Sequence, residues 1–143
     1  MSDPSLALQT AIKPALDNDA GVAAAFEAAP VRIYDTTPTG KAGTLPSDYI
    51  VIGEDLVLPD LAEGLDAAET ETTLHIWSLT DPPSKAKAKA IGAAATSAVL
   101  AIETLDGHRI TSSWVIRTAY LTDPSDGKTA HGVVVIRFAT EPL

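Results

Sequence analysis

Three histidines, His75, His108 and His131, are the side chains of this sequence best suited to metal binding or general-base catalysis. An imidazole titrates near neutral pH and is a common metal ligand. None of the three stands in H-x-x-x-H or H-x-H spacing, and each lies in or beside a segment with strand character. We therefore interpret them as structural or surface histidines and predict no metal ligand among them.

Carboxylates between positions 54 and 71 could serve acid–base chemistry or bind a divalent cation; they are Glu54, Asp55, Asp60, Glu63, Asp66, Glu69 and Glu71. Paired carboxylates catalyse only in a cleft that perturbs their pKa values. The run lacks the EF-hand pattern, so no motif supports a cation held by Asp60, Glu63 and Asp66. We interpret these residues as belonging to solvated acidic loops.

Serines and glycines offer two further kinds of chemistry. Ser112 and Ser113 lie in a strand-like run without the G-x-S-x-G context of a serine nucleophile. Gly40, Lys41 and Gly43 lack the spacing of a phosphate-binding P-loop. The sequence therefore predicts no catalytic residue and no cofactor-binding residue, and we expect the protein not to be an enzyme.

Three lysines, Lys85, Lys87 and Lys89, stand at the start of a predicted helix. Positive charge at a helix N-terminus is unfavourable to the helix dipole. Two interpretations stay open: a solvated helix face, or a contact for a phosphate or an acidic partner.

Composition and charge narrow the class of protein. The 143 residues fit one domain, residues 1–143, and 45% of them are hydrophobic, although aromatic residues make up only 5%. Such a core is thin, and assembly into an oligomer would complete it. Nineteen acidic and ten basic residues give a net charge of −9, which argues against duplex-DNA binding through phosphate neutralisation. The acidity serves solubility, or else it lines a channel through which DNA passes without sticking.

The sequence carries no sign of export or membrane insertion. It has no cysteine, so disulfides and thiolate metal ligands are excluded. Its first residues lack the basic and apolar regions of a signal peptide, and no apolar run approaches the ~20 residues of a membrane span. We expect a soluble protein, made in the cytoplasm, with no membrane partner.

The N-terminal third reads as helical. Pro4 opens a first helix with a buried stripe of Leu6, Ala7, Ile12 and Leu16. Pro14 is expected to kink this helix or to end it near Lys13. Asn18 and Asp19 restart the chain as a second, alanine-rich helix over residues 20–28.

The remainder of the chain predicts a β-β-α-β-β order. Strands are expected at residues 49–58, 70–79, 110–121 and 133–139, with the main helix at 85–102. The last two strands flank a turn in which Asp126-Gly127 supplies positive φ, as in a hairpin. The predicted fold class is therefore α+β: a four-stranded antiparallel or mixed sheet, with N-terminal helices and one main helix packed on one face.

Alternation in the last hairpin separates two faces. The predicted core face consists of Ile110, Trp114, Ile116, Tyr120, Val134, Ile136 and Phe138. The other face consists of Arg109, Thr111, Ser113, Val115, Arg117, Val133, Val135 and Arg137. It is half polar and half β-branched, which suits a subunit interface or ordinary solvent exposure. A one-residue slip of register would exchange the two faces.

An ordered set of short segments over nearly the whole chain resembles the tail-completion or tail-terminator family of long-tailed phages, prophages and gene transfer agents. The segments are Ala7–Ile12, Ile33–Asp35, Pro46–Glu54, Leu74–Ser78, Lys87–Ile91, Leu105–His108, Asp126–Gly132 and Arg137–Glu141. In one departure from the family pattern, Ser47-Asp48 separates Pro46 from Tyr49 where the family often reads Phe-Pro-Tyr.

The resemblance implies a ring of six copies at the head-proximal end of the tail tube, located at the head–tail junction of a virion. Its partners would be other copies of the chain, the tail tube protein and a head-side connector or stopper protein, and DNA would pass through without specific binding. Our candidate contact residues for the neighbouring subunit or the tube are Arg109, Arg117, Arg137, Lys41, Asp60 and Glu63. The alternatives are a head–tail connector, a monomeric α+β adaptor, or a small cytoplasmic enzyme or ligand-binding domain.

Overall fold

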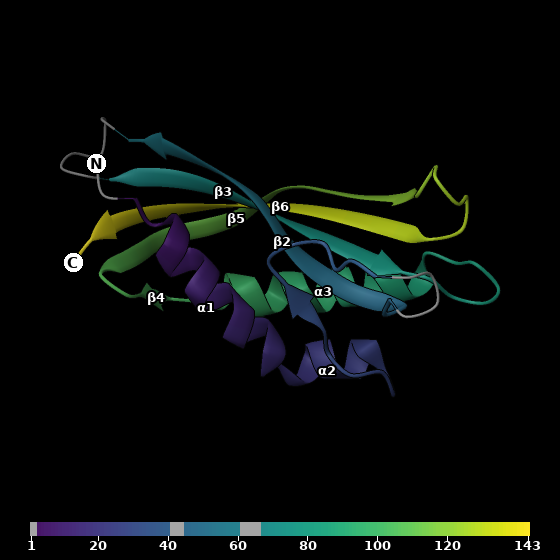
Figure 1. Ribbon diagram of the computed structural model, residues 1–143. Helices are drawn as coiled ribbons and strands as arrows, with labels where there is room; N and C mark the ends of the chain where they lie inside the picture. Colours follow the sequence, from purple (N-terminus) through teal and green to yellow (C-terminus); the bar gives the residue numbers. More distant parts are fainter. Residues whose placement is uncertain (1–2, 41–44, 61–66) are drawn as a thin grey trace.

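A curled sheet with helices on one face makes up the protein, as seen in a computed structural model that describes residues 3–40, 45–60 and 67–143 (Figure 1). In chain order the described elements are α1 (Ser5–Asp17), α2 (Ala20–Phe26), β1 (Ile33–Tyr34), β2 (Asp48–Pro59), β3 (Ala68–Ser78), α3 (Ala86–Leu100), β4 (Thr104–Leu105), β5 (His108–Thr122) and β6 (Ala130–Pro142). The α+β class and the β-β-α-β-β order of the long strands are confirmed. The sheet has six strands instead of the expected four, because β1 and β4 add one short strand at each edge.

The strand order across the sheet is β1-β2-β3-β6-β5-β4. Only β1 and β2 run parallel, and every other neighbouring pair is antiparallel. The last strand, β6, returns to lie between β3 and β5, so the two central strands come from distant parts of the chain. A strand of two residues is too short to show alternation, so the hydrophobic pattern does not predict β1 and β4 as strands.

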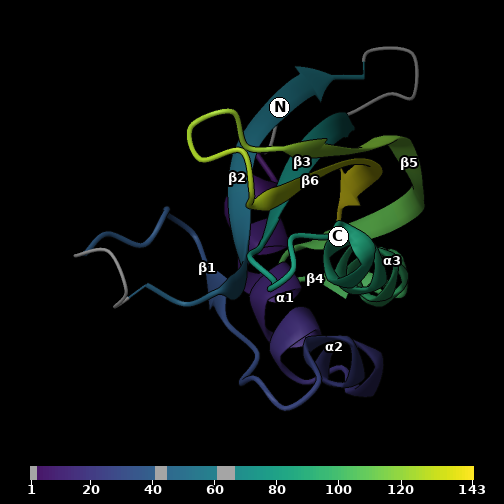
Figure 2. The same ribbon diagram turned by 90° about the vertical axis from the view of Figure 1, so that its right-hand side faces the viewer.

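All three helices lie on the same side of the sheet (Figure 2). Helix α1 buries Leu8, Ile12 and Leu16, which are spaced four residues apart and so share one helix face. The prediction that Leu6 is buried is wrong, because this side chain is 74% exposed. Of the two outcomes expected at Pro14, a kink or an end near Lys13, the early end is wrong. The helix continues to Asp17 across the exposed Pro14, and an ion pair of 2.7 Å from Lys13 Nζ to Asp17 Oδ2 spans the proline.

Helix α3 packs on the sheet through small side chains. Ala88, Ala95 and Ala98 are buried beside Ile91 and Val99. Gly92 is buried in the same helix because Tyr120 of β5 lies against it, and a Cβ on Gly92 would stand 2.1 Å from the Tyr120 hydroxyl oxygen.

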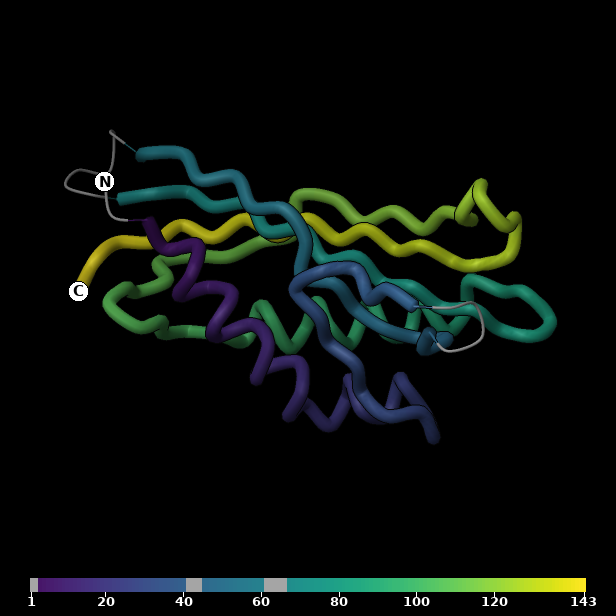
Figure 3. The backbone as a smooth tube through the Cα atoms, in the orientation of Figure 1, coloured from purple at the N-terminus to yellow at the C-terminus, as the bar shows by residue number. Residues whose placement is uncertain are grey.

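The predicted hairpin between β5 and β6 is confirmed. Gly127 has a φ of 67°, and the Asp126 carboxylate accepts hydrogen bonds from the backbone N–H groups of Lys128 (2.9 Å) and Thr129 (3.0 Å) and from the Thr129 hydroxyl. These bonds, that of the Thr129 side chain first, lower the pKa of Asp126 to about 2. The turn lies at one end of the molecule, whereas α1 begins and β6 finishes at the other end (Figure 3).

Two β-bulges change the predicted faces of β5. The register of β5 on β6 shifts between Ile110 and Ser112 and again between Val115 and Arg117. Each bulge adds one residue and inverts the alternation. Trp114 and Ile116, predicted in the core, are therefore 36% and 39% exposed, whereas Val115, predicted on the opposite face, packs against the core.

The rest of the predicted core face is confirmed. Val134, Ile136 and Phe138 of β6 are buried in the cluster beneath the sheet, and Ile110 and Tyr120 of β5 pack against its margin. Along the described chain, no helix combines the length and the apolar character that crossing a membrane requires.

Candidate assembly interface

The helices leave one face of the sheet uncovered, the face turned away from them, here called the outer face. Its members on β5 and β6 alternate with the core residues: Arg109, Trp114, Arg117, Ala119, Leu121, Val133, Val135, Arg137 and Glu141. The three arginines predicted to share one face do share it. The two bulges of β5 cancel between Arg109 and Arg117, so only the stretch between the bulges is inverted. Val133 and Val135 are buried although they belong to this face.

Arg137 stands at the centre of the outer face in an ion-pair cluster. Its guanidinium pairs with Glu71 at close range and with Glu69 at 3.5 Å, and it lies 5.9 Å from the ring centre of Trp114. The hydrogen bond that Arg137 donates to the Glu71 carboxylate is the largest cause that raises the pKa of Arg137 above its ordinary value. A guanidinium held by two carboxylates and an indole ring is positioned firmly, with much of its charge compensated.

The other two arginines differ from each other. Arg109 forms an ion pair with Glu141 on β6, the residue directly opposite to it. Arg117 is exposed, and no ion pair to it is found within the described chain. Of the three, Arg117 therefore presents the positive charge that is most available to a second molecule.

The remaining predicted contact residues lie at the loops. Asp60 follows β2, and its backbone N–H donates to the carbonyl of Ala67 at 2.9 Å, which closes the β2–β3 connection. Lys41 and Glu63 lie outside the described residues. The structure therefore places the arginines together on the outer face and places Asp60 at the far end of the opposite edge strand.

A row of aromatic rings crosses the outer face near the start of β2. Tyr34 meets Tyr49 edge to face with ring centres 6.0 Å apart, Tyr49 stacks on Trp77 at 6.4 Å, and Trp77 stacks on His131 at 3.8 Å. The row ends at His75, whose ring centre lies 5.1 Å from that of His131. Four strands contribute to this row, so no spacing in the sequence reveals it.

Two of the three histidines form a hydrogen-bonded pair. His75 Nδ1 lies 2.8 Å from His131 Nε2, and His75 Nε2 lies 3.0 Å from the Glu54 carboxylate. A carboxylate only accepts hydrogen bonds, so His75 donates from Nε2 to Glu54 and accepts from His131 at Nδ1. Burial, followed by the neighbouring His75, lowers the pKa of His131. The pKa of Glu54 is lowered chiefly by a bond from its own backbone N–H and also by His75.

Sequence reasoning missed this histidine pair, because 56 residues separate its members and only the antiparallel pairing of β3 with β6 brings them together. A pocket of about 400 Å³ lies over the pair, lined also by Asp35, Trp77 and Gly53. Gly53 leaves the space that His75 occupies, since a Cβ there would stand 2.7 Å from His75 Cδ2. His108 is buried elsewhere, with its Nδ1 3.1 Å from the Asp106 carbonyl. No group of metal-ligating side chains is found in the described residues.

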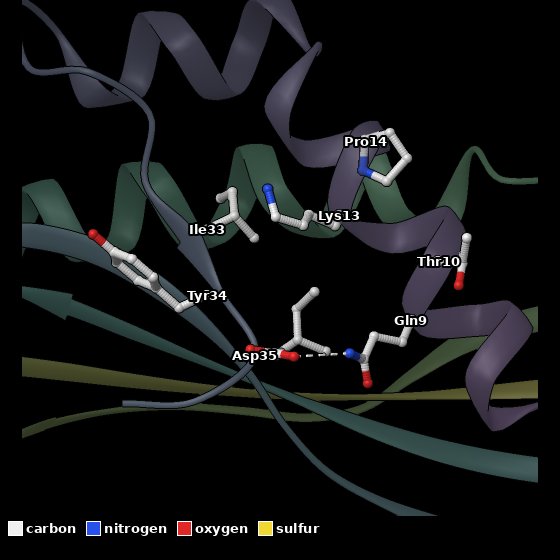
Figure 4. A pocket seen from close by; sticks show the side chains of 8 residues that line it. Gln9, Thr10, Lys13, Pro14, Ile33, Tyr34 and Asp35 are labelled. Carbon is white, nitrogen blue, oxygen red and sulfur yellow. Dashed lines mark hydrogen bonds between the residues drawn. The ribbon is translucent and has the colours of Figure 1, made fainter. Parts of the chain in front are cut away.

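A second pocket, of about 450 Å³, lies between α1 and the start of the sheet (Figure 4). The Gln9 amide donates to the Asp35 carboxylate across it at 3.3 Å, and Lys13, Tyr34 and Ile33 line its walls. Gln9 and Asp35 thus link α1 to the end of β1, while Lys13 pairs with Asp17 of its own helix.

The three lysines at the start of α3 have separate environments. Lys87 pairs with the buried Asp48 at 2.8 Å, and Asp48 also accepts from the Ser78 hydroxyl at 2.6 Å. Lys89 lies 6.0 Å from the ring centre of Tyr120. Lys87 thus ties α3 to β2, whereas Lys85 and Lys89 stay on an exposed helix face.

Comparisons with known proteins identify a family through one family model and a fold through a solved structure. A family model described as tail completion protein gp17 matches residues 10–141. Among curated protein sequences no match to the chain was found. A chain in a solved structure described as the virion of a native gene transfer agent particle has the same fold, with a TM-score of 0.80 and 22% identity, and the match covers 99% of both chains.

Proposed function

The chain belongs to the tail completion protein gp17 family, and on this premise we propose that it forms a ring at the head-proximal end of a tail tube. As a member of this family it is a structural protein of the tail of a phage or gene transfer agent virion. In the proposed role the ring stops tube polymerisation and joins the tail to the head. The observation that carries the proposal is the family match over residues 10–141, supported by a fold shared along 99% of a chain from a gene transfer agent virion.

The outer face and the sheet edges supply the surfaces that such a role requires. A ring subunit needs one contact for each neighbour and separate surfaces for the tube and the head-side protein. The helices cover only one face of the sheet, so the outer face and both edges stay available. We assign Arg109, Arg117, Arg137 and Asp60, and with them Lys41 and Glu63, to contacts with the neighbouring subunit or the tube.

The charge of the chain fits a ring through which DNA passes. The net charge is −9, and two of the three arginines on the outer face are paired with carboxylates. Phosphate groups are held by clusters of unpaired Lys and Arg, so passing DNA finds no retaining surface there. The proposed role is structural and involves no catalytic step.

Deleting the gene and examining the tails by electron microscopy tests the role. A missing terminator gives overlong tails without heads, because nothing stops the tube from growing. Tails of normal length without heads would instead indicate the connector role, and normal tails joined to heads would contradict both roles. Mass measurement of the purified protein, alone and with tail tubes, should show six copies, and a strict monomer under both conditions would contradict the ring.

A further inference from the structure

Strand β5 has an open edge along most of its length. Strand β4 pairs only with His108 and Arg109 at its beginning, and no other described strand lies on that side. After the second bulge the register of β5 on β6 is continuous from Arg117 to Thr122. An open edge presents unpaired N–H and C=O groups and is a template for another strand. This regular stretch is therefore the part of the edge on which a second strand can pair.

The hydrogen bonds of β5 show which residues serve the open edge. Asp123, the first residue after β5, donates its backbone N–H to the Thr129 carbonyl at 2.8 Å, on the β6 side. In an antiparallel pair every second residue bonds to the same neighbour. Residues 117, 119 and 121 therefore bond to β6. The N–H and C=O groups that point to the open side belong to Thr118, Tyr120 and Thr122.

The seven residues from Arg117 to Asp123 are complementary to the same residues in the opposite direction. Their sequence is Arg-Thr-Ala-Tyr-Leu-Thr-Asp. Reversal about Tyr120 sets three kinds of residues opposite each other: Arg117 with Asp123, Thr118 with Thr122, and Ala119 with Leu121. Opposite charges and threonine pairs are favourable across antiparallel strands. The same reversal brings the open N–H and C=O groups of two copies opposite one another.

The two charged ends of this stretch have no ion-pair partner within one copy. Arg117 is exposed, and neither it nor the Asp123 carboxylate takes part in an ion pair among the described residues. The Asp123 carboxylate accepts a hydrogen bond of 3.0 Å from the backbone N–H of Ser125. Leu121 is 54% exposed. A second copy in the reversed direction would supply the opposite charge at both ends and cover the leucine of each copy.

The helix side of the open edge leaves room for a second strand. The two threonines of the stretch point to that side by alternation and are exposed. The Tyr120 ring leans away from the edge, over Gly132 of β6 and Gly92 of α3. A Cβ on Gly132 would stand 2.9 Å from this ring, and one on Gly92 would stand 2.1 Å from its hydroxyl oxygen. Lys89 Nζ lies 6.0 Å from the ring centre, and the flexible lysine stem lets this exposed charge turn to solvent.

The opposite edge of the sheet, on β2, is a poorer partner for β5. The backbone N–H of Asp60 donates to the Ala67 carbonyl on the β3 side, so residues 56 and 58 bond to β3 as well. The open groups of this edge then belong to Asp55, Val57 and Pro59. Proline has no backbone N–H to donate, and residues 55–59 contain no basic side chain to face Asp123. A second β5 strand meets both requirements.

We propose that two copies of the chain pair through residues 117–123, antiparallel and two-fold about Tyr120. Thr118, Tyr120 and Thr122 of each copy exchange backbone hydrogen bonds with the same residues of the other copy in reverse order. Arg117 of each copy forms an ion pair with Asp123 of the other. The two sheets become one continuous sheet, with the helices of both copies on the same side.

This inference goes beyond the proposed function. A contact made by the same surface of both copies closes on itself, so it does not build a ring. Ring contacts and the β5 pair therefore use different surfaces, and one can be present without the other. The pair covers the open β5 edge of copies that are not in a ring.

Cysteine cross-linking of the purified protein tests the pairing, because the chain contains no cysteine of its own. In the proposed register Ala119 of one copy lies opposite Leu121 of the other, without backbone hydrogen bonds between these two residues. The Cα atoms of such a pair lie about 4.5 Å apart, which suits a disulfide. Ala119→Cys and Leu121→Cys are prepared as single variants and as a double variant. Each is oxidised mildly without tail tubes, after thermal melting has shown that it folds.

Mixing the two single variants should give a cross-linked dimer with one copy of each variant, identified by its mass. The matched control mixes Ala119→Cys with Leu6→Cys, an exposed position on α1. The paired thiols should react at least about tenfold faster than the control, because contact raises their effective concentration to the millimolar range. The double variant should give dimers and nothing larger, since one partner occupies the whole edge.

Charge reversal gives an independent test by sedimentation. Arg117→Glu sets like charges opposite each other at both ends of the pair and should raise the Kd of the dimer by about tenfold or more. Asp123→Lys should have a similar effect, and the two changes together should restore most of the affinity. The matched control, Lys85→Glu, reverses an exposed charge at the start of α3 and should leave the Kd unchanged.

Three results would overturn the pairing. The first is a mixture that reacts no faster than the control; if mass measurement then shows six copies, the ring stands without this pair. The second is a single variant that cross-links with itself as fast as the mixture does, which indicates another register. The third is a ladder of larger multimers from the double variant, which indicates a contact between unlike edges. Conversely, cross-linked dimers together with normal, head-bearing tails in the deletion strain would support the pair and contradict the proposed function.

Discussion

Strands β5 and β6 are neighbours of similar length, yet β6 is buried along most of its course and β5 is largely exposed. The difference follows from their places in the sheet. Strand β6 has β3 on one side and β5 on the other, whereas β5 has β6 on one side and two residues of β4 on the other. The pairing of β6 with β3 is regular over its whole length, and the two bulges of β5 occur where no second neighbour constrains it. The number of neighbouring strands thus decides how closely a strand keeps its alternation.

The largest predicted effect is a difference in the stability lost by a variant in β6 and a variant in β5. Phe138→Ala in β6 removes a fully buried ring and should lower the free energy of unfolding by about 3–5 kcal/mol. Trp114→Ala in β5 removes a ring that lies on the outer face, so its cost should stay below about 1.5 kcal/mol, in the range of a ring–cation contact. Urea unfolding measures both variants. Equal losses would contradict the contrast between a buried and an exposed strand.

A smaller effect tests the bulge between Val115 and Arg117. Val115→Asp would bring a carboxylate against the core and should cost about 1–3 kcal/mol or more. Ile116→Asp, one residue further, changes an exposed position and should stay within about 0.5 kcal/mol. Thermal melting of the two variants gives the comparison. If Ile116→Asp destabilised the protein more than Val115→Asp, the strand would alternate without a bulge, and the register described here would be wrong.

The smallest predicted effect is on the pH dependence of stability and concerns His131, an outer-face residue near the start of β6. Its pKa is lowered by burial and then by His75, while Asp123 and Glu54 oppose the shift. Below the ordinary value of about 6.5 the unfolded chain therefore binds more protons than the folded chain, and the free energy of unfolding should fall as pH falls from about 6.5 toward the lower pKa of the folded state.

His131→Asn removes this titration, so unfolding measured between pH 7.5 and pH 5.5 should depend less on pH in the variant than in the original protein. Asp35 also lines the pocket over the pair, and its carboxylate is unchanged in both proteins. An equal pH dependence in the two proteins would show that the histidine pair does not contribute to it.

Central elements were predictable from sequence, since a strand with two neighbours or a helix over a sheet must follow a regular period. The burial of Val134, Ile136 and Phe138 and the turn at Asp126-Gly127 follow this rule. The bulges of β5 do not, because an edge strand can gain one residue without breaking a second ladder of hydrogen bonds. Trp114 and Ile116 were misplaced for this reason.

The candidate site was predictable in part. The shared face of Arg109, Arg117 and Arg137 was expected, but which of them carries an unpaired charge depends on Glu69, Glu71 and Glu141, which reach them only through strand pairing. The histidine pair likewise needs β3 beside β6. Such contacts join residues far apart in the chain, and no local spacing encodes them.

The two shortest strands have a consequence for assembly. Strand β1 occupies the edge of β2 at Ile50 and Val51, and β4 occupies the edge of β5 at His108 and Arg109. Each covers only two residues of the long strand beside it, so the rest of both edges has no partner strand among the described residues. Any strand that a neighbouring subunit adds to this sheet therefore has to enter beyond those two points.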